Sequence, residues 1–130
     1  MDNYLYSKDH EWVLSQERRA KVGISEFAQS ELGDISFVEL PDVGRKVNRG
    51  EAVCSIDSLK STSEIYAPVS GTVLEVNEKL ADEQACAIVN SDPLGQGWLF
   101  IIEMSNPKEI EELLTRAEYE HYLESGEDLC

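Results

Sequence analysis

Short apolar runs separated by turn residues fill the middle of this chain, and this pattern limits the fold more than any other feature. Between residues 34 and 104, each run is rich in side chains that favour strands, and Gly, Pro, Asn or Asp stands between the runs. Many short strands with regularly spaced turns are typical of a small antiparallel sandwich or barrel. Strands are expected at residues 4–14 (one or two), 20–24, 35–40, 52–56, 64–67, 72–76 and 98–104.

Two helices are expected to accompany these strands. Ser25 is a candidate N-cap, apolar residues follow it at helical spacing, and Gly33 ends the pattern. A C-terminal helix is expected at about residues 107–124, with Asn106 as its N-cap and Pro107 at its first position. The fold class is therefore mainly β, with a short helix in the N-terminal half and a C-terminal helix. The apolar stripe expected to dock the second helix on the sheet comprises Ile110, Leu113, Leu114 and Ala117.

The size and charge of the chain narrow the classes of protein to which it can belong. Its 130 residues are expected to form one domain, residues 1–130, and a hydrophobic content of 42% is typical of a globular chain. A net charge of −15, from 26 acidic and 11 basic side chains, argues against nucleic acid and anionic membranes as partners. The same charge favours docking on basic patches of partner proteins.

Other features indicate the compartment and exclude some chemistry. No stretch reaches membrane-spanning length, and the first residues show neither a basic leader nor an apolar signal core. Cys54, Cys86 and Cys130 form no CxxC pair, so neither a disulfide framework nor a zinc site is expected. His10 and His121 lack partners at metal-ligand spacing. We therefore expect a monomeric, cytoplasmic protein in a reducing compartment, with no metal site and no catalytic residues.

The segment at about residues 52–67 carries the most specific signal. Two β-capable runs flank a polar centre at residues 57–61, which predicts a β-hairpin with Lys60 at its tip. An exposed lysine in a turn is usually only a solubilising charge. Here the turn-forming residues 68–71 follow at the spacing seen after the modified lysine of swinging-arm carriers, which favours an attachment site.

Five blocks of the chain, in order, resemble the H proteins of the glycine cleavage system. They are residues 6–13, 22–29, 32–41, the lysine motif Asp57-Ser58-Leu59-Lys60, and residues 90–93 with Gly97-Trp98. The resemblance implies a lipoyl/biotinyl-type barrel-sandwich hybrid, also called a hammerhead. It also implies that Lys60 is the covalent attachment site of lipoic acid.

The resemblance implies a carrier rather than an enzyme. Proteins of this family take an aminomethyl group from glycine decarboxylase (P protein) to aminomethyltransferase (T protein), and dihydrolipoamide dehydrogenase (L protein) reoxidises them. A lipoylating enzyme is a further partner. The cofactor supplies the chemistry, and the protein supplies tethering and recognition.

Four carboxylates are candidates for supporting roles around the arm. Asp9, Glu11 and Glu64 lie in the blocks expected to be nearest the arm and are candidates to receive the ammonium of its cargo. Asp57 and Glu64 are candidates to mark the lysine for the lipoylating enzyme. For all four, plain solvated surface charge is the competing interpretation.

Other readings of the sequence remain open to test. A biotinyl carrier would have methionines beside its lysine, where this chain has Leu59 and Ser61, and the lipoyl domains of 2-oxoacid dehydrogenases lack the first block and both helices. An H-like protein that relays lipoyl groups to other acceptors would need the same Lys60. Two departures from the family pattern keep that role open: a longer loop at residues 80–90, and Leu94 where an aromatic residue is usual. An unmodified acidic interaction module would leave the lysine motif unexplained.

Overall fold

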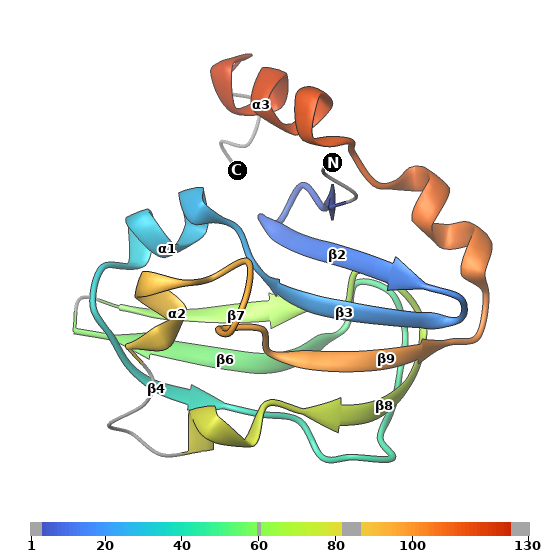
Figure 1. Ribbon diagram of the computed structural model, residues 1–130, viewed down its shortest axis with the longest axis horizontal. Coiled ribbons are helices and arrows are strands. Elements are labelled where there is room, and N and C mark those ends of the chain that lie inside the picture. The colour runs from blue at the N-terminus through green and yellow to red at the C-terminus, as the bar shows by residue number, and fades with distance from the viewer. Residues whose placement is uncertain (1–3, 60, 82–86, 126–130) are drawn as a thin grey trace.

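A computed structural model describes residues 4–59, 61–81 and 87–125 of the chain. It is mainly β, as the sequence predicts, and all strand pairs are antiparallel (Figure 1). The larger sheet has six strands in the order β1-β2-β3-β9-β8-β5, and the smaller has three in the order β4-β6-β7. Their bounds are β1 Leu5–Tyr6, β2 Glu11–Gln16, β3 Arg19–Ile24, β4 Ile35–Glu39, β5 Lys46–Val47, β6 Ala52–Ser58, β7 Thr62–Tyr66, β8 Gly71–Val76 and β9 Phe100–Met104.

One buried apolar cluster joins the two sheets. Every strand except β1 contributes at least one buried apolar side chain to it. Burial of a large aliphatic or aromatic side chain stabilises the fold by roughly 1.5–3 kcal/mol, so this cluster is the main source of stability. Its fully buried members include Val13, Val22, Ile24, Ile56, Val69, Phe100 and Ile102.

The predicted first helix is present as α1, Glu26–Leu32. The side chain of Ser25 accepts a hydrogen bond from the backbone N–H of Ala28 at 3.1 Å, which confirms the predicted N-cap. Gly33 follows with φ of 78°, a conformation that favours glycine, and its N–H donates to the Gln29 carbonyl. Local sequence therefore determines both ends of this helix.

The C-terminal segment differs from the single helix expected at about 107–124. It forms a 3₁₀ helix, η3 (Pro107–Glu112), and a separate α-helix, α3 (Arg116–Ser125). Between them the chain pairs with the N-terminal strand, because the N–H groups and carbonyls of Tyr6 and Leu114 bond each other at 2.7 Å. This backbone pairing replaces the helical hydrogen bonds that a continuous helix would form there.

The residues of the expected apolar stripe consequently separate. Ile110 and Leu113 pack against the main cluster, whereas Leu114 packs against a second cluster and Ala117 is exposed. The second cluster comprises Tyr6, Trp12, Tyr119 and Tyr122, and it places α3 beside β1 and β2 (Figure 1).

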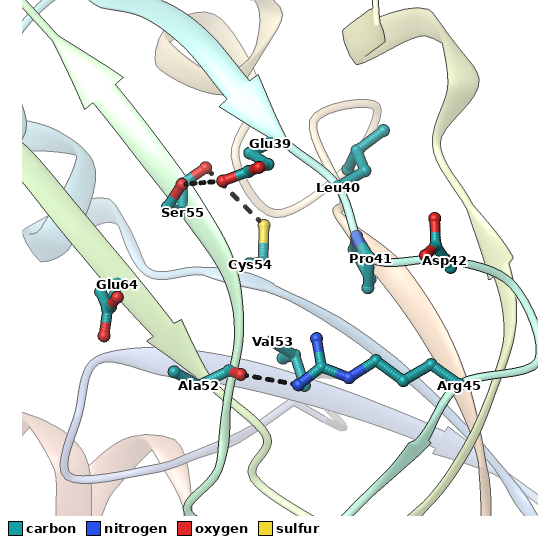
Figure 2. A pocket seen from close by; sticks show the side chains of 10 residues that line it. All are labelled: Glu39, Leu40, Pro41, Asp42, Arg45, Ala52, Val53, Cys54, Ser55 and Glu64. Atoms are coloured by element: carbon teal, nitrogen blue, oxygen red, sulfur yellow. Dashed lines mark hydrogen bonds between the residues drawn. The ribbon is translucent and has the colours of Figure 1, made fainter.

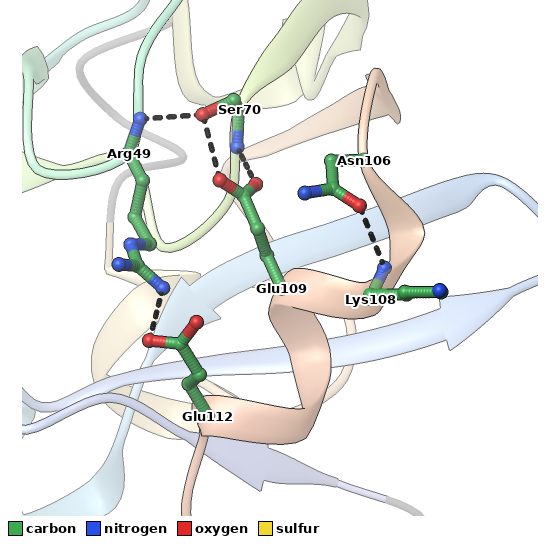
Figure 3. A network of polar contacts seen from close by, with 6 residues as sticks. All are labelled: Arg49, Ser70, Asn106, Lys108, Glu109 and Glu112. Carbon is green, nitrogen blue, oxygen red and sulfur yellow. Dashed lines mark hydrogen bonds and ion pairs between the residues drawn. The ribbon is translucent and has the colours of Figure 1, made fainter.

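Polar contacts hold η3 against the turns between strands (Figure 3). The side chain of Asn106 accepts from the Lys108 N–H, which confirms the predicted cap. Glu109 does not complete a capping box with it; its carboxylate accepts from the backbone N–H of Ser70 at 2.6 Å and from the Ser70 hydroxyl at 3.1 Å. Arg49 and Glu112 form an ion pair at 2.6 Å. Glu109 thus provides the hydrogen-bond acceptor for the backbone N–H of Ser70, although the two residues are far apart in the sequence.

Some short elements were not predicted. Strand β5, the 3₁₀ helix η1 (Glu78–Ala81) and the helix α2 (Ile88–Ser91) each contain only a few residues, too few to produce a periodic pattern. Helix α2 begins within the long loop at residues 80–90, of which residues 82–86 lie outside the described residues.

Candidate functional site

The hairpin formed by β6 and β7 is the centre of the candidate site. Its two strands pair from Ala52 with Tyr66 to Asp57 with Thr62, within the range where a hairpin was expected. At the tip, the N–H of Ser58 donates to the carbonyl of Ser61 at 2.8 Å. The loop between these serines contains Leu59, which is 76% exposed, and Lys60, which lies outside the described residues.

The base of this loop is firmly held. Thr62 Oγ1 donates to Asp57 Oδ1 at 2.8 Å, and the N–H of Ser61 donates to Ser58 Oγ at 3.0 Å. The N–H of Leu59 donates to the carbonyl of Asp34 at 3.0 Å, which ties the loop to the segment before β4. A rigid base fixes the pivot of any group attached at position 60.

The structure places two of the predicted carboxylates on the hairpin strands, a third in contact with the base of the hairpin, and the fourth in a separate turn. Asp57 and Glu64 lie on β6 and β7, at successive positions on the same sheet face. Asp9 is exposed in the turn between β1 and β2. Glu11, in contrast, is only 1% exposed, so the interpretation of Glu11 as solvated surface charge is wrong.

Glu11 connects β2 to the base of the hairpin. Its Oε1 accepts from the hydroxyl of Ser7 at 2.8 Å, and its Oε2 accepts from the backbone N–H of Tyr66 at 2.9 Å. Burial raises the pKa of Glu11 to about 8, and the charge of Asp9 adds to the rise, while the two hydrogen bonds oppose it. The carboxyl therefore holds its proton near neutral pH.

A network that the sequence did not reveal lies beside Glu11. His10 adopts φ of 70°, and its Nδ1 is hydrogen-bonded to the hydroxyl of Tyr119 at 2.8 Å. The same hydroxyl is hydrogen-bonded to Ser25 Oγ at 2.7 Å. The α3 helix is thereby fastened to the turn before β2 and to the cap of α1. No local signal connects residues so distant in sequence.

Leu94, which stands where an aromatic residue is usual in the family, is partly buried. It packs with the second cluster, and its carbonyl accepts from the hydroxyl of Tyr4 at 2.6 Å. Trp12 is fully buried and donates from Nε1 to the carbonyl of Pro93 at 2.8 Å. Trp98 is only half-buried and lies under Lys21 Nζ, 5.5 Å from the ring centroid.

The described residues contain no cluster of His, Cys, Asp and Glu able to hold a metal ion. Burial raises the pKa of the Cys54 thiol to about 12, with the charges of Glu39 and Glu11 adding to it, so this thiol is not a nucleophile near neutral pH. Cys86 and Cys130 lie outside the described residues. No helix in the part of the chain that the structure describes is long and apolar enough to span a membrane.

Comparison with known proteins assigns the chain to a family. The family model described as "Glycine cleavage H-protein" matches residues 4–126. The chain belongs to the glycine cleavage H-protein family.

Relatives cover nearly the whole length of this family member. A glycine cleavage system H protein of Thermotoga maritima is 48% identical over 117 residues, which is 90% of this chain and 93% of that protein. The Bacillus subtilis H protein is 49% identical over 115 residues, covering 88% of this chain and 89% of that protein. The crystal structure of a glycine cleavage system H protein from Mycobacterium marinum has a TM-score of 0.83 and 35% identity, and it covers 95% of this chain and 97% of that chain. The likeness to this structure confirms the predicted barrel-sandwich fold.

Proposed function

We propose that this chain is the lipoyl carrier of a glycine cleavage system, and that the lipoyl group forms an amide with Nζ of Lys60. Family membership and the firmly held hairpin tip at Ser58–Ser61 are the observations that support this function. The chain acts as a carrier component and not as an enzyme. Its partners are glycine decarboxylase, aminomethyltransferase, dihydrolipoamide dehydrogenase and a lipoylating enzyme.

The residues around position 60 fit a tethered group. The loop residues Ser58, Leu59 and Ser61 lie outside the buried core. Because Leu59 is 76% exposed, a modifying enzyme can reach this loop. When attached, a lipoyl group would supply a disulfide that is reduced as it takes up the aminomethyl group, and a dithiol that then gives its electrons to the dehydrogenase that reoxidises it. The protein holds the base of the arm and presents its own surface to each enzyme.

The dimensions of the hairpin fit a docked arm. A lipoyl-lysine arm reaches roughly 14 Å from the backbone. Strand β7 runs from Thr62 to Tyr66, a rise of roughly 14 Å for four residue steps. Because the arm starts at position 60, two residues before this strand, an arm laid along it would end near the level of Glu64.

We infer that Asp9 and Glu64 are the carboxylates that receive the ammonium of the cargo, because both are exposed. Glu11 is buried and hydrogen-bonded through both oxygens, so it would influence the cargo without contacting it. The test is the half-life of the aminomethyl cargo on Asp9→Asn and Glu64→Gln carriers. A half-life equal to that of the wild type in the double variant would reject this role.

The intact mass of the chain purified from its own cells tests the attachment site. One added lipoyl amide, mapped to Lys60, is expected, and Lys60→Arg should remove it while leaving the melting temperature unchanged. Lys46→Arg, a change at an exposed lysine of β5, should keep the full modification. A bare Lys60 in cells supplied with lipoate would overturn the proposal.

Reconstitution separates glycine cleavage from lipoyl relay. The modified chain, mixed with glycine decarboxylase, aminomethyltransferase and dihydrolipoamide dehydrogenase, should support release of carbon dioxide from glycine. A modified chain that fails with all three enzymes, yet donates its lipoyl group to other acceptor proteins, would favour the relay role.

We also propose that the carrier works in the cytoplasm. Cys54 is a free, buried cysteine, and a free thiol is compatible with a reducing compartment.

A further inference from the structure

The outer face of the small sheet lies directly beside the hairpin tip. In β4, Val38 is buried while its neighbours Phe37 and Glu39 are exposed, so these two point away from the core. The strand register places Phe37 opposite Asp57, and Asp57 opposite Thr62. Because residues directly opposite each other share a sheet face, these three side chains form one row.

A second row on the same face lies two residues further from the tip. It comprises Glu39, Ser55 and Glu64, which are opposite one another in the same register. The hydroxyl of Ser55 donates to Glu39 Oε1 at 3.1 Å. The row between these two, Val38, Ile56 and Ser63, faces the other way, with Val38 and Ile56 in the core.

This face combines exposed apolar side chains with carboxylates of one sign. Phe37 is 39% exposed, and Leu59 in the loop at the tip is 76% exposed, although most large apolar side chains in the described part of the chain are buried or half-buried. Glu39, Asp57 and Glu64 supply negative charge in the two rows. An exposed apolar patch rimmed by charge is typical of a protein interaction surface.

The end of the face away from the tip is hollowed (Figure 2). The hollow has a volume of about 360 Å³, and Glu39, Ser55 and Glu64 line it together with the loop at Pro41 and Asp42. Arg45 also borders it, but its guanidinium pairs with Glu51 at 2.9 Å and donates to the Ala52 carbonyl at 3.2 Å. The carboxylates of the hollow thus outnumber its single, already paired cation.

We propose that this outer face of β4, β6 and β7 docks the enzyme that attaches the lipoyl group, through a basic surface with an apolar recess on that enzyme. This inference rests on the proposed function and names the partner of the same site. Phe37 and Leu59 enter the recess, and basic side chains of the enzyme lie against Glu39, Asp57 and Glu64. The face is distinct from the carboxylates of the β1–β2 turn, and it needs no attached arm.

The reach of the lysine explains why this partner, rather than the glycine cleavage enzymes, uses the face. An unmodified lysine extends only roughly 6 Å from its Cα, less than half the roughly 14 Å of the modified arm. The lipoylating enzyme must therefore contact residues within one row of the tip, where Phe37 and Asp57 lie. Enzymes that receive the finished arm can dock further away.

The chemistry of attachment needs only an acyl transfer. The neutral amine of Lys60 attacks the carbonyl carbon of an activated lipoyl donor, such as the adenylate made from lipoate and ATP. An amide bond forms, the bond to adenylate breaks, AMP leaves, and the amine loses one proton to solvent. No oxidant or reductant takes part, and the docking face contributes by positioning the lysine.

Steady-state lipoylation of the unmodified chain by a lipoate–protein ligase, with lipoate and ATP, tests the proposal. Phe37→Ser is expected to raise KM for the chain by about tenfold, and Glu39→Gln by several-fold, with kcat within about twofold of the wild type. Glu39→Gln keeps an acceptor for Ser55 and removes only the charge. Glu103→Gln, at an exposed carboxylate of β9 on the other sheet, is the matched control and should leave KM unchanged.

A binding measurement gives a second readout that does not depend on turnover. In a Lys60→Arg background the ligase cannot complete the reaction, so calorimetry reports docking alone. Phe37→Ser and Glu39→Gln should weaken this binding in proportion to their effects on KM, and added salt should weaken it less in the Glu39→Gln chain.

The outcomes separate the inference from the function on which it rests. Equal KM values for the wild type, Phe37→Ser and Glu39→Gln, or an equal shift in Glu103→Gln, would overturn the docking face while leaving lipoylation of Lys60 intact. Unchanged lipoylation combined with lost glycine-dependent release of carbon dioxide would assign the face to the decarboxylase and also overturn the proposal. A wild-type chain that no ligase modifies would instead reject the proposed function.

Discussion

Replacing Glu11 with glutamine should change how the stability of this protein depends on pH. The carboxyl is 1% exposed and bonds the Ser7 hydroxyl and the Tyr66 N–H. Glutamine has nearly the same shape; its carbonyl can accept from Tyr66, and its amide can donate to Ser7 Oγ. The substitution therefore removes a titratable proton with little change in packing.

The sign and size of the effect follow from the pKa of Glu11, which burial raises from 4.5 to about 8. Below pH 4.5 the carboxyl is neutral in both states, and no stability is lost. Between pH 4.5 and about 8 the unfolded chain releases this proton while the folded chain keeps it, so stability falls with rising pH by about 1.4 kcal/mol per unit. Across the window the loss amounts to roughly 5 kcal/mol at most, and it ends once the folded state also ionises above pH 8.

Urea unfolding of the wild type and of Glu11→Gln at pH 5, 6, 7 and 8 measures this effect. The other carboxylates act in both chains, so the difference in unfolding free energy between the two isolates Glu11. The wild type should lose stability relative to the variant as pH rises. Glu75→Gln, at an exposed residue of β8, should track the wild type at every pH.

A difference between wild type and Glu11→Gln that stays constant from pH 5 to 8 would refute this reasoning. It would mean that the buried carboxyl is already ionised in the folded state, stabilised by its two hydrogen bonds. A difference that moves in favour of the wild type with rising pH would refute it more strongly, because it would require a folded-state pKa below 4.5.

Three further substitutions test the packing seen in the structure by urea unfolding at pH 7. Gly71→Ala should destabilise the protein by about 1–3 kcal/mol, because its methyl group would collide with the backbone carbonyl of Glu103 across the β8–β9 pair; an effect below half a kcal/mol would argue against so close an approach. Tyr119→Phe should cost about 1–2 kcal/mol through the two hydrogen bonds of its hydroxyl, and a neutral result would show that water replaces them. Asn90→Ala should cost about 2–3 kcal/mol, since its amide joins α1, β4 and α2 by three hydrogen bonds; equal stability would contradict that role.

Much of the fold was predictable because its signals are local. Short apolar runs between turn residues predicted the longer strands, and the polar centre at residues 57–61 predicted the turn of the hairpin. Ser25 and Gly33 determine α1, since a cap acts within one helical turn. The lysine motif was recognisable because it is a short contiguous segment of the sequence.

Other features could not be predicted, because they depend on contacts between distant residues. The break between η3 and α3 arises where Leu114 pairs with Tyr6, a partner more than a hundred residues away. Glu109 stands three residues after the cap Asn106, which is the spacing of a capping box, yet its carboxylate accepts from the N–H and the hydroxyl of Ser70. The three short elements β5, η1 and α2 carry no periodic signal.

The sequence by itself determined the class of fold, the place of the hairpin and the lysine on which the proposed function depends. These follow from side-chain periodicity, turn chemistry and one short motif, which act over a few residues. Only the tertiary structure decided that Glu11 is buried and keeps its proton, that Tyr119 fastens α3 to His10, and that Phe37 shares a face with Asp57 beside the lysine. Burial, pKa and shared faces depend on which strands become neighbours, and that is settled by the packing of the whole chain.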